Sequence, residues 1–478
     1  MAYDQKAANV WTARVIPFVL IGIVAYSTWV IVAQVCVDYL LKPSKYAAKT
    51  RPGAAIAILV FYCLLLLLVA ITYFRLLYTV LVHPAYTPRG PQYYANKTEA
   101  ANGRPSRSAM RPAANTILDE KLDSSGTHEG KENGELEGNA YPSRLTATGR
   151  GTDLEATAPG LEQFYTKDVF VCEGDGRPIW CSTCLNWKPD RTHHCREVQR
   201  CVRKMDHFCP WVGGIVSETN FKFFVLFVAW AAIYCFFALV VMAVFVAERK
   251  KAGYGFNAHW LVVLGFAAFF GSFNLGMFAT SFQFILVNTT TVENLSRHTK
   301  VYTLAIYMPN PPAPASTSFQ TITYPLPTQP RRSSLNTNGP SVPSTPPRTF
   351  AILHSKPGES PWDLGPRRNF RSVMGEKWWD CILPLKYSPC CNHSRGDSAF
   401  EMGPVVARMR ERAGIAVPRS GNSSRTPSRR RRRRSKQQPD EEEGGIARSH
   451  RHRRRRPSEH RRSVHADGAR DEADDGVV

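Results

Sequence analysis

The chain has 478 residues and carries 61 Lys and Arg against 39 Asp and Glu, which gives a formal net charge of +22 at pH 7. This length allows more than one domain. The mean hydropathy is slightly negative, yet the apolar residues are gathered into four long runs. That distribution excludes an ordinary soluble globular protein.

The four runs are free of charged residues and long enough to cross a lipid bilayer. A helix needs about 20 apolar residues to span a hydrocarbon core of roughly 30 Å. The first run is too long for a signal-peptide core and lacks a clear small-x-small cleavage site, so we expect it to be retained. Residues 1–87 and 221–287 therefore each hold two predicted spans, which are Val15–Val37, Ala54–Phe74, Phe223–Ala247 and Trp260–Ile285.

The segments between and after the spans differ in composition. Residues 88–160 are rich in Gly, Ser, Asn, Thr and charge, which is typical of a disordered linker. Residues 161–220 hold half of the twelve cysteines. After the fourth span we expect a juxtamembrane segment 288–308, a disordered Pro/Ser/Thr-rich linker 309–348, an island with aromatic anchors 361–385 and a disordered basic tail 404–478.

The basic tail contains two unbroken arginine runs, Arg429–Arg434 and Arg453–Arg456, and few apolar residues. On a protein with four spans, anionic lipid headgroups are the nearest partner for such runs. A solvated tail without a specific partner is the alternative. No aromatic residues are interleaved with the runs, so nucleic acid is not expected as a partner.

An even number of spans places both chain termini on one side of the membrane. The first short loop carries Lys42, Lys45, Lys49 and Arg51, so the distribution of positive charge does not decide which side this is. Thiols spaced for metal binding persist in a reducing compartment. We therefore predict an α-helical polytopic membrane protein whose termini and cysteine-rich segment are cytosolic.

The cysteine-rich segment opens with Cys181-x-x-Cys184, and His194 and Cys201 follow. Thiolate and imidazole are the preferred ligands of tetrahedral zinc, and three cysteines with one histidine form a complete set. The pattern predicts a zinc site. A group of reduced structural thiols is the alternative.

Downstream of this set, the stretch "RKMDHFCPWVGG" places Cys209 two residues after His207. A nucleophilic thiol must be ionised, and a nearby imidazole can accept its proton. Asp206 is suited to hold that imidazole in the required tautomer. The trio thus predicts a nucleophile, a general base and an orienting carboxylate. On spacing alone, a structural turn beside the zinc site is an equal alternative.

The sequence Cys181–Phe224 resembles the DHHC family of protein S-acyltransferases, as does a cysteine-rich loop between the second and third of four spans. Two further motifs share this resemblance: "TTVE" with Thr290, Thr291 and Glu293 after the fourth span, and the aromatic-Asn motif "RNFRSVMG" with Asn369. The resemblance implies a ping-pong palmitoyltransferase. It would move a long-chain acyl group from acyl-CoA to cysteines of membrane-associated proteins through an acyl intermediate on Cys209.

The chain departs from the family at the second zinc site, which the family usually has. Cys195 remains, but Val198, Phe208 and Ile215 stand where the other ligands are usual, so the tetrapeptide reads DHFC. We expect one zinc per chain and an apolar cluster in place of the second. Cys195 is then a buried free thiol or, as the alternative, a partner for Cys172. The usual "DPG" after the second span is replaced by "HPA".

Contacts with acyl-CoA are predicted at five positions: Lys188, Arg191, His193, Trp211 and Tyr234. The first three form a basic cluster that suits the CoA phosphates, with ordinary surface charge as the alternative. We expect Tyr234 to close the acyl pocket, with its hydroxyl bonded to Ser272 or Asn274; a tyrosine that only packs between helices is the alternative. A catalytically inactive zinc-binding scaffold and a pseudoenzyme are the competing functions.

Overall fold

The computed structural model describes residues 5–43, 49–102, 159–312, 317–326 and 346–415. Most of the predicted linker 88–160 and of the tail 404–478, including both arginine runs, lies outside these residues. Everything below concerns the described part of the chain.

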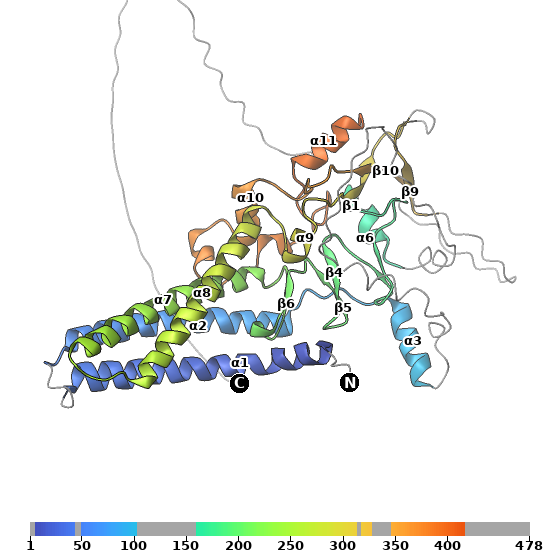
Figure 1. The fold of residues 1–478 in the computed structure, drawn as a ribbon. Helices are drawn as coiled ribbons and strands as arrows, with labels where there is room; N and C mark the ends of the chain where they lie inside the picture. Colours follow the sequence, from blue (N-terminus) through green and yellow to red (C-terminus); the bar gives the residue numbers. More distant parts are fainter. Residues whose placement is uncertain (1–4, 44–48, 103–158, 313–316, 327–345, 416–478) are drawn as a thin grey trace, which may run out of the picture. The chain divides into compact units, whose positions relative to one another are not determined.

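Four long helices confirm the four predicted spans and extend beyond them at both ends. Each is apolar and long enough to cross a membrane, which indicates a multi-pass integral membrane protein. The first span is an α-helix that continues as a π-helical segment. The bounds are α1 Gln5–Trp29 with η1 Val30–Leu41, α2 Pro52–Val82, α7 Phe221–Lys251 and α8 Ala258–Leu286 (Figure 1).

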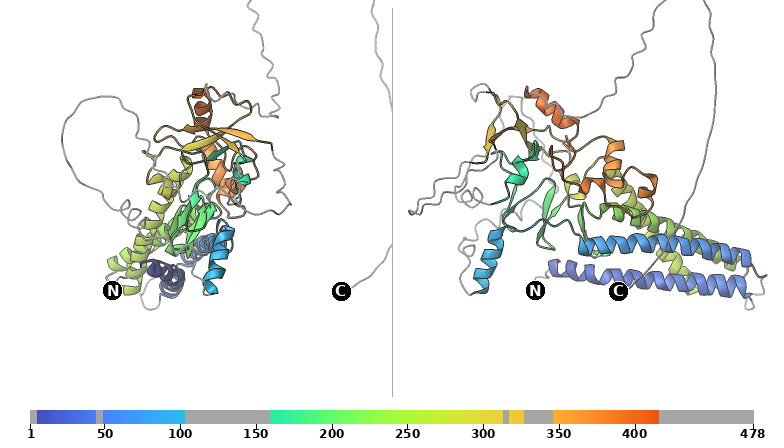
Figure 2. Two further views of the ribbon diagram at one scale, coloured as in Figure 1. Left: turned by 90° about the vertical axis from the view of Figure 1, so that its right-hand side faces the viewer. Right: turned by 180° about the vertical axis from the view of Figure 1, so that it is seen from behind.

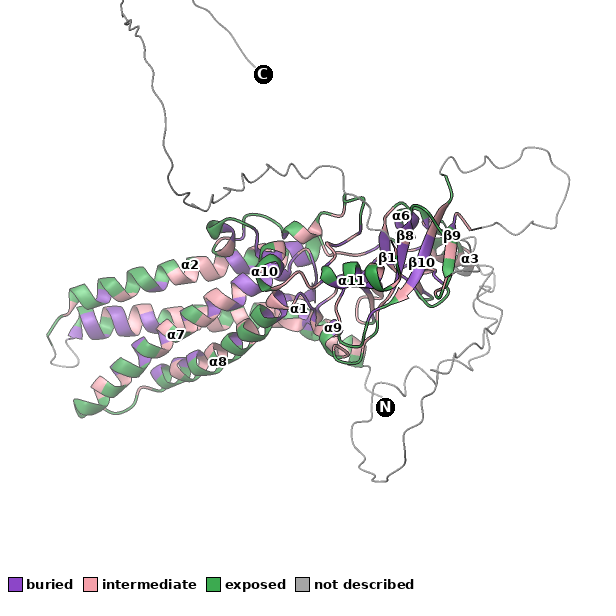
Figure 3. Ribbon diagram, turned by 90° about the horizontal axis from the view of Figure 1, so that it is seen from above, coloured by how far each residue is buried: buried purple, intermediate pink, exposed green. Residues whose placement is uncertain are grey.

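The spans pack through α7, which contacts both α2 and α8. Ala238 and Met242 of α7 are buried in one cluster with Tyr62 of α2 and Ala267 of α8, so small residues allow close approach of the helices. Exposed residues line the other faces of these helices (Figure 3). Apolar side chains exposed along entire helices are typical of contact with lipid.

A four-stranded antiparallel sheet joins segments from before the third span and after the fourth (Figure 2). Phe170, Phe350 and Ile352 are buried on one of its faces. The prediction of a wholly disordered linker 309–348 is therefore wrong, because the consecutive residues Thr321–Tyr324 form a strand that pairs with the sheet. In sheet order the strands are β1 Val169–Val171, β8 Thr303–Met308, β10 Arg348–His354 and β9 Thr321–Tyr324.

Two short helices also correct the predicted linker and tail. Helix α3, Pro91–Ala101, occupies the start of the linker, and α11, Pro404–Arg412, occupies the start of the tail. Three apolar side chains of α11, Val405, Val406 and Met409, pack against the sheet. A stripe of three residues is enough to bury a short helix, although the composition of the tail around it is strongly basic.

Three β-hairpins carry the cysteine-rich segment. The second pairs His194 with Cys201, and the third pairs Cys209 with Gly214. Gly213 closes the third turn at φ +75°, a conformation that favours glycine. The hairpins are β2 Trp180–Cys181 with β3 Asn186–Trp187, β4 Thr192–Cys195 with β5 Arg200–Arg203, and β6 His207–Cys209 with β7 Gly214–Val216, the last pair joined through η4 Pro210–Val212.

The remaining elements are short and flank the hairpins and the ends of the spans. They are α6 Glu162–Tyr165, α9 Thr291–Asn294, α10 Pro366–Met374, η6 Trp378–Cys381 and η7 Pro389–Cys391. Helix α10 contacts α8, so the aromatic island 361–385 lies against the fourth span.

Candidate functional site

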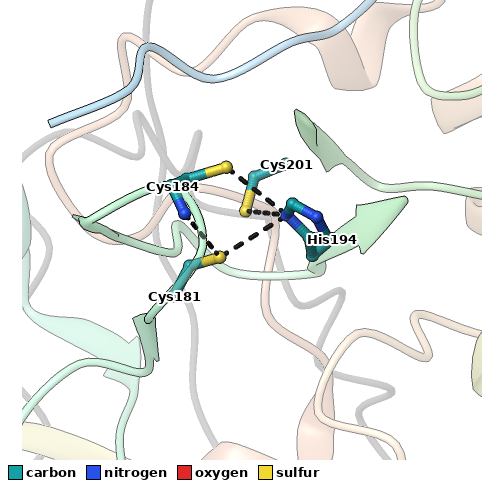
Figure 4. Close-up of side chains that lie close together, drawn as sticks. All are labelled: Cys181, Cys184, His194 and Cys201. Carbon is teal, nitrogen blue, oxygen red and sulfur yellow. Dashed lines mark hydrogen bonds between the residues drawn. The ribbon is translucent and has the colours of Figure 1, made fainter. Parts of the chain in front are cut away.

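The predicted zinc ligands Cys181, Cys184, His194 and Cys201 come together (Figure 4). Their ligand atoms all lie within 4.8 Å of one another, and they form the one such group among the described residues. Nδ1 of His194 lies 3.4, 3.6 and 3.8 Å from the three sulfur atoms. Tetrahedral zinc with usual bond lengths requires about 3.6 Å between sulfur and nitrogen. The geometry and chemistry of the group therefore fit Zn²⁺.

An apolar cluster surrounds Cys195. Cys195 and Ile215 are buried in it, with Val198 and Phe208 packed against them. Cys195 is a free thiol, as predicted, and Cys172 is also free and belongs to a different cluster. Burial raises the pKa of Cys195 to about 11, so this thiol is neutral at pH 7. The predicted apolar cluster around Cys195 is therefore present.

The third hairpin brings Asp206, His207 and Cys209 together. The His207 ring donates from Nδ1 to Oδ2 of Asp206 over 2.7 Å. Asp206 also accepts from the backbone N–H of Thr291 and from its hydroxyl, each at 2.9 Å. The carboxylate is nearly buried, so these donors determine the orientation of the imidazole. The "TTVE" motif therefore supports the predicted trio directly.

Two opposing effects act on His207. Burial lowers its pKa, but hydrogen bonds to Asp206 and Cys209 outweigh burial and raise the pKa to about 10. The Phe224 ring meets the imidazole edge to face, with centroids 5.4 Å apart. At neutral pH the ring is consequently an imidazolium whose positive charge faces the Cys209 sulfur.

Cys209 lies between the hairpins and the membrane spans. Its exposed fraction is 5%, and it is part of an apolar cluster with Phe224 and Val228 of α7. The Tyr73 hydroxyl of α2 donates to the Trp211 carbonyl over 3.1 Å, which fixes the turn after Cys209 against a span. The thiol is thus held at the membrane end of the cysteine-rich domain.

One apolar cavity lies next to this thiol, and a second lies among the spans. The first, about 280 Å³, is lined by His207, Cys209 and Trp211. The second, about 710 Å³, lies among α1, α2, α7 and α8. They share four lining residues, Leu20, Phe227, Phe270 and Asn274. The two cavities therefore lie side by side, and the one at Cys209 adjoins the one between the helices.

Tyr234 lines the larger cavity, as does Ala238 one turn further along α7. Its hydroxyl bonds to the Tyr62 hydroxyl over 2.7 Å, and Tyr62 bonds to Thr28 over 2.8 Å. The expected partners Ser272 and Asn274 were therefore wrong. Each donates to a carbonyl four residues earlier in its own helix, Ala268 and Phe270 respectively, because a polar side chain in an apolar helix satisfies itself locally.

Arg191 is not part of a surface cluster for CoA phosphates, which corrects that prediction. Its buried guanidinium donates to both carboxylate oxygens of Glu293, at 2.8 and 2.6 Å, and to the side chain and carbonyl of Asn288. Glu293 in turn forms a capping box with Thr290. Arg191 thus joins the second hairpin to the "TTVE" segment, and its donors are used internally.

Of the other two members of the expected cluster, His193 departs from the predicted cationic patch and Lys188 does not. Burial lowers the pKa of His193 to about 4, so His193 is neutral at pH 7. Lys188 is half-buried and stays a predicted CoA contact. Since Arg191 is buried and paired and His193 is neutral, only Lys188 of the three residues can offer a positive charge to the CoA phosphates.

Asn369 joins the island to the fourth span. Its Nδ2 donates to the Leu286 carbonyl at 2.8 Å and to Asp363 at 2.7 Å, while its Oδ1 accepts from the backbone of Leu364. Since Leu286 ends α8, Asn369 satisfies a helix-terminal carbonyl that has no partner within the helix. This motif residue therefore has a structural position behind the "TTVE" segment.

Sequence reasoning missed several residues that hold the site. The Arg191 guanidinium lies 4.8 Å from the Trp362 ring, and Asn288 donates to the Trp362 carbonyl. Gly90 donates its N–H to the Cys184 carbonyl, and a Cβ at Gly90 would lie 1.6 Å from a backbone oxygen. These contacts join positions up to 171 residues apart, from 191 to 362, so no local pattern reveals them.

Comparisons with known proteins agree with this geometry. Residues 175–298 match the family described as DHHC palmitoyltransferase. The chain is 42% identical over 432 residues to palmitoyltransferase pfa5 of Aspergillus fumigatus, covering 88% of this chain and 94% of that relative. It is 42% identical over 437 residues to palmitoyltransferase pfa5 of Emericella nidulans, covering 86% and 87%. Palmitoyltransferase PFA3 of Yarrowia lipolytica is 30% identical over 259 residues, covering 51% and 54%.

The similarity to the first relative extends over almost the full length of both chains, and the matched domain contains the Cys/His cluster and the Asp206–His207–Cys209 trio. The chain therefore belongs to the DHHC palmitoyltransferase family of acyltransferases, in a form whose tetrapeptide is DHFC.

Proposed function

We propose that the protein transfers a palmitoyl group from acyl-CoA to cysteine thiols of membrane-associated proteins, through a thioester on Cys209. The observation that carries the proposal is the position of Cys209, beside His207 and in the wall of an apolar cavity that adjoins a larger one among the spans. A thiol at this place can react with a carbonyl at the membrane surface while the attached chain remains in an apolar environment.

In the first half-reaction, the Cys209 thiolate attacks the thioester carbonyl of acyl-CoA. The proton that left Cys209 is on His207, and it passes to the departing CoA sulfur. In the second half-reaction, His207 takes the proton of a substrate cysteine. The substrate sulfur then attacks the Cys209 thioester, and the Cys209 thiolate leaves. Asp206 keeps the imidazole oriented in both steps.

The acyl chain is proposed to occupy the cavities lined by Trp211 and Tyr234. Burying each methylene stabilises the complex by about 0.8 kcal/mol, so a long chain supplies much of the binding energy. Lys188 is the remaining candidate among the expected contacts for the CoA phosphates. Substrate cysteines must reach Cys209 from the membrane surface, which favours proteins with membrane-proximal thiols.

The cluster of Cys181, Cys184, His194 and Cys201 is proposed to hold one Zn²⁺. When bound, zinc supplies structural cross-linking of the first two hairpins, because the four protein ligands complete its coordination. The chain's own residues then keep the third hairpin in place against α7. Reduced ligand thiols also favour a cytosolic position for this domain and for both termini.

The test is labelling of the full-length purified protein with an alkyne analogue of palmitoyl-CoA. We expect label on Cys209 that hydroxylamine removes, and no such label in Cys209→Ser. Cys63→Ser is the matched control, since this exposed thiol of α2 lines neither cavity. If wild type takes up no hydroxylamine-labile label while its domain remains folded, a non-catalytic scaffold replaces the proposal.

A further inference from the structure

Residues 378–387, at the end of the aromatic island and just after it, expose five large apolar side chains. Their exposed fractions lie between 36% and 71% within ten residues of chain: Trp378 71%, Leu385 60%, Trp379 37%, Tyr387 37% and Ile382 36%. Two lysines, Lys377 and Lys386, lie within or beside this stretch. A contiguous apolar surface of this kind marks an interaction site, and its position relative to the spans identifies the partner.

The α7 helix provides one measure of depth. It is 31 residues long, or about 46 Å at 1.5 Å per residue, which exceeds a hydrocarbon core of roughly 30 Å. The apolar run of α7 ends at Glu248, the first charged residue after it. Crossing the hydrocarbon core takes about 20 residues, so counting back from Glu248 puts the other boundary of the core near Val228. Trp230 lies at this boundary, and its indole N–H donates to the Ile382 carbonyl over 3.0 Å.

The α2 helix provides a second, independent measure. Its apolar sequence begins at Gly53, directly after Arg51 and Pro52, so the same count of about 20 residues ends near Tyr73. Arg75 follows at once. Its guanidinium lies 5.1 Å from the Phe223 ring and 5.2 Å from the Tyr387 ring. On both helices, the boundary of the hydrocarbon core therefore lies beside residues that contact the segment 382–387.

The segment also explains the surroundings of Lys222 in the first turn of α7. Its exposed fraction is 1%, and its ammonium has no hydrogen-bond partner. Asp380 of η6 is likewise buried. The residues of α7 from Phe221 to Leu226 are all buried. The island covers these first turns together with α2 and the third hairpin. Lipid contact on α7 begins after this cover, at exposed Ile233.

From these contacts we infer that residues 378–385 form a membrane-embedded wedge on the same side of the bilayer as Cys209. Its partner is the boundary between lipid headgroups and acyl chains. Tryptophan prefers this boundary because one part of the indole is apolar and its N–H is polar. Flanking lysines reach the headgroups from there. The wedge continues the lipid-facing surface of α7, and it does not depend on the proposed acyl transfer.

The experiment measures tryptophan fluorescence of the full-length protein in nanodiscs of phosphatidylcholine, with or without bromine on the upper acyl chain. Subtracting the double variant Trp378→Tyr/Trp379→Tyr from wild type isolates the two indoles. We expect brominated lipid to remove most of this difference signal and aqueous iodide to leave it nearly unchanged. Leu385→Trp, which removes no aromatic ring, should add a signal with the same behaviour.

Two variants calibrate the measurement. The signal lost in Trp29→Tyr, from the first span, must be quenched by brominated lipid, and the signal gained in Tyr94→Trp, from exposed α3, must be quenched by iodide. Quenching of the wedge indoles by iodide and not by brominated lipid overturns the inference, since the surface then faces water. Protection from both quenchers also overturns it, because protein then covers the segment.

Discussion

Replacing Thr291 by valine tests how much the "TTVE" segment contributes to the active site. The substitution keeps the shape and the backbone N–H bond to Asp206, and it removes the hydroxyl bond of 2.9 Å. A hydrogen bond to a charged group contributes about 1.5–3 kcal/mol. Loss of the full amount in the transition state would slow autoacylation roughly 10- to 150-fold, since 1.36 kcal/mol corresponds to a factor of ten. We expect the lower end, because the N–H bond remains.

The assay is the single-turnover rate of autoacylation by palmitoyl-CoA, with Thr291→Ser as the matched control that retains the hydroxyl. The serine variant should approach the wild-type rate, and thermal unfolding of both variants should remain close to wild type. The reasoning is refuted if the valine variant is as fast as wild type. It is equally refuted if serine is as slow as valine, since the hydroxyl is then not the cause.

Three further predictions concern the metal, the histidine and the acyl chain. Elemental analysis of the purified protein should give one zinc per chain; a ratio near two would show that the apolar cluster around Cys195 is not the substitute we describe. The pKa of His207 rises from 6.5 to about 10, so the charge of its ring contributes stability that is complete below pH 6.5 and is lost as the pH rises through 10. Asp206→Asn should therefore flatten the fall of melting temperature over this alkaline range. An unchanged profile would show that Asp206 is not the cause of the raised pKa. In competition between acyl-CoAs, Tyr234→Ala should shift the preferred acyl chain from sixteen toward eighteen carbons, by up to about 15-fold at 0.8 kcal/mol per methylene. The control Tyr62→Phe keeps the Tyr234 ring and should keep the preference. An unchanged preference in an active Tyr234→Ala variant would show that the ring does not limit the length of the chain.

Local chemistry explains what could be predicted. The spans follow from the length of uncharged apolar runs, which needs no knowledge of neighbours. The zinc ligands follow from cysteine and histidine spacing within one short segment, and the Asp206–His207–Cys209 trio follows from four consecutive residues. The apolar cluster around Cys195 could also be expected, because three polar ligand positions were replaced by apolar residues that must be buried.

The errors share a different cause. Arg191 was expected at the surface because arginine is seldom buried, yet Glu293, 102 residues away, provides a buried carboxylate partner. Residues around β9 and α11 were assigned to disordered segments from composition. Short apolar stripes there become stable only when β8 and β10 offer a surface to cover. Tyr234 was paired with the wrong helix because helix rotation decides which polar groups meet.

The sequence by itself determined the four spans, the metal ligand set and the reactive trio, since each depends on residues that are close in the chain. Only the tertiary structure decided how these parts are joined. Thr291 holds Asp206, Arg191 holds Glu293, and the indole of Trp230 holds the island at the end of α7. Such contacts depend on the distance between segments in space, which hydrophobic burial and buried hydrogen bonds establish together when the chain folds.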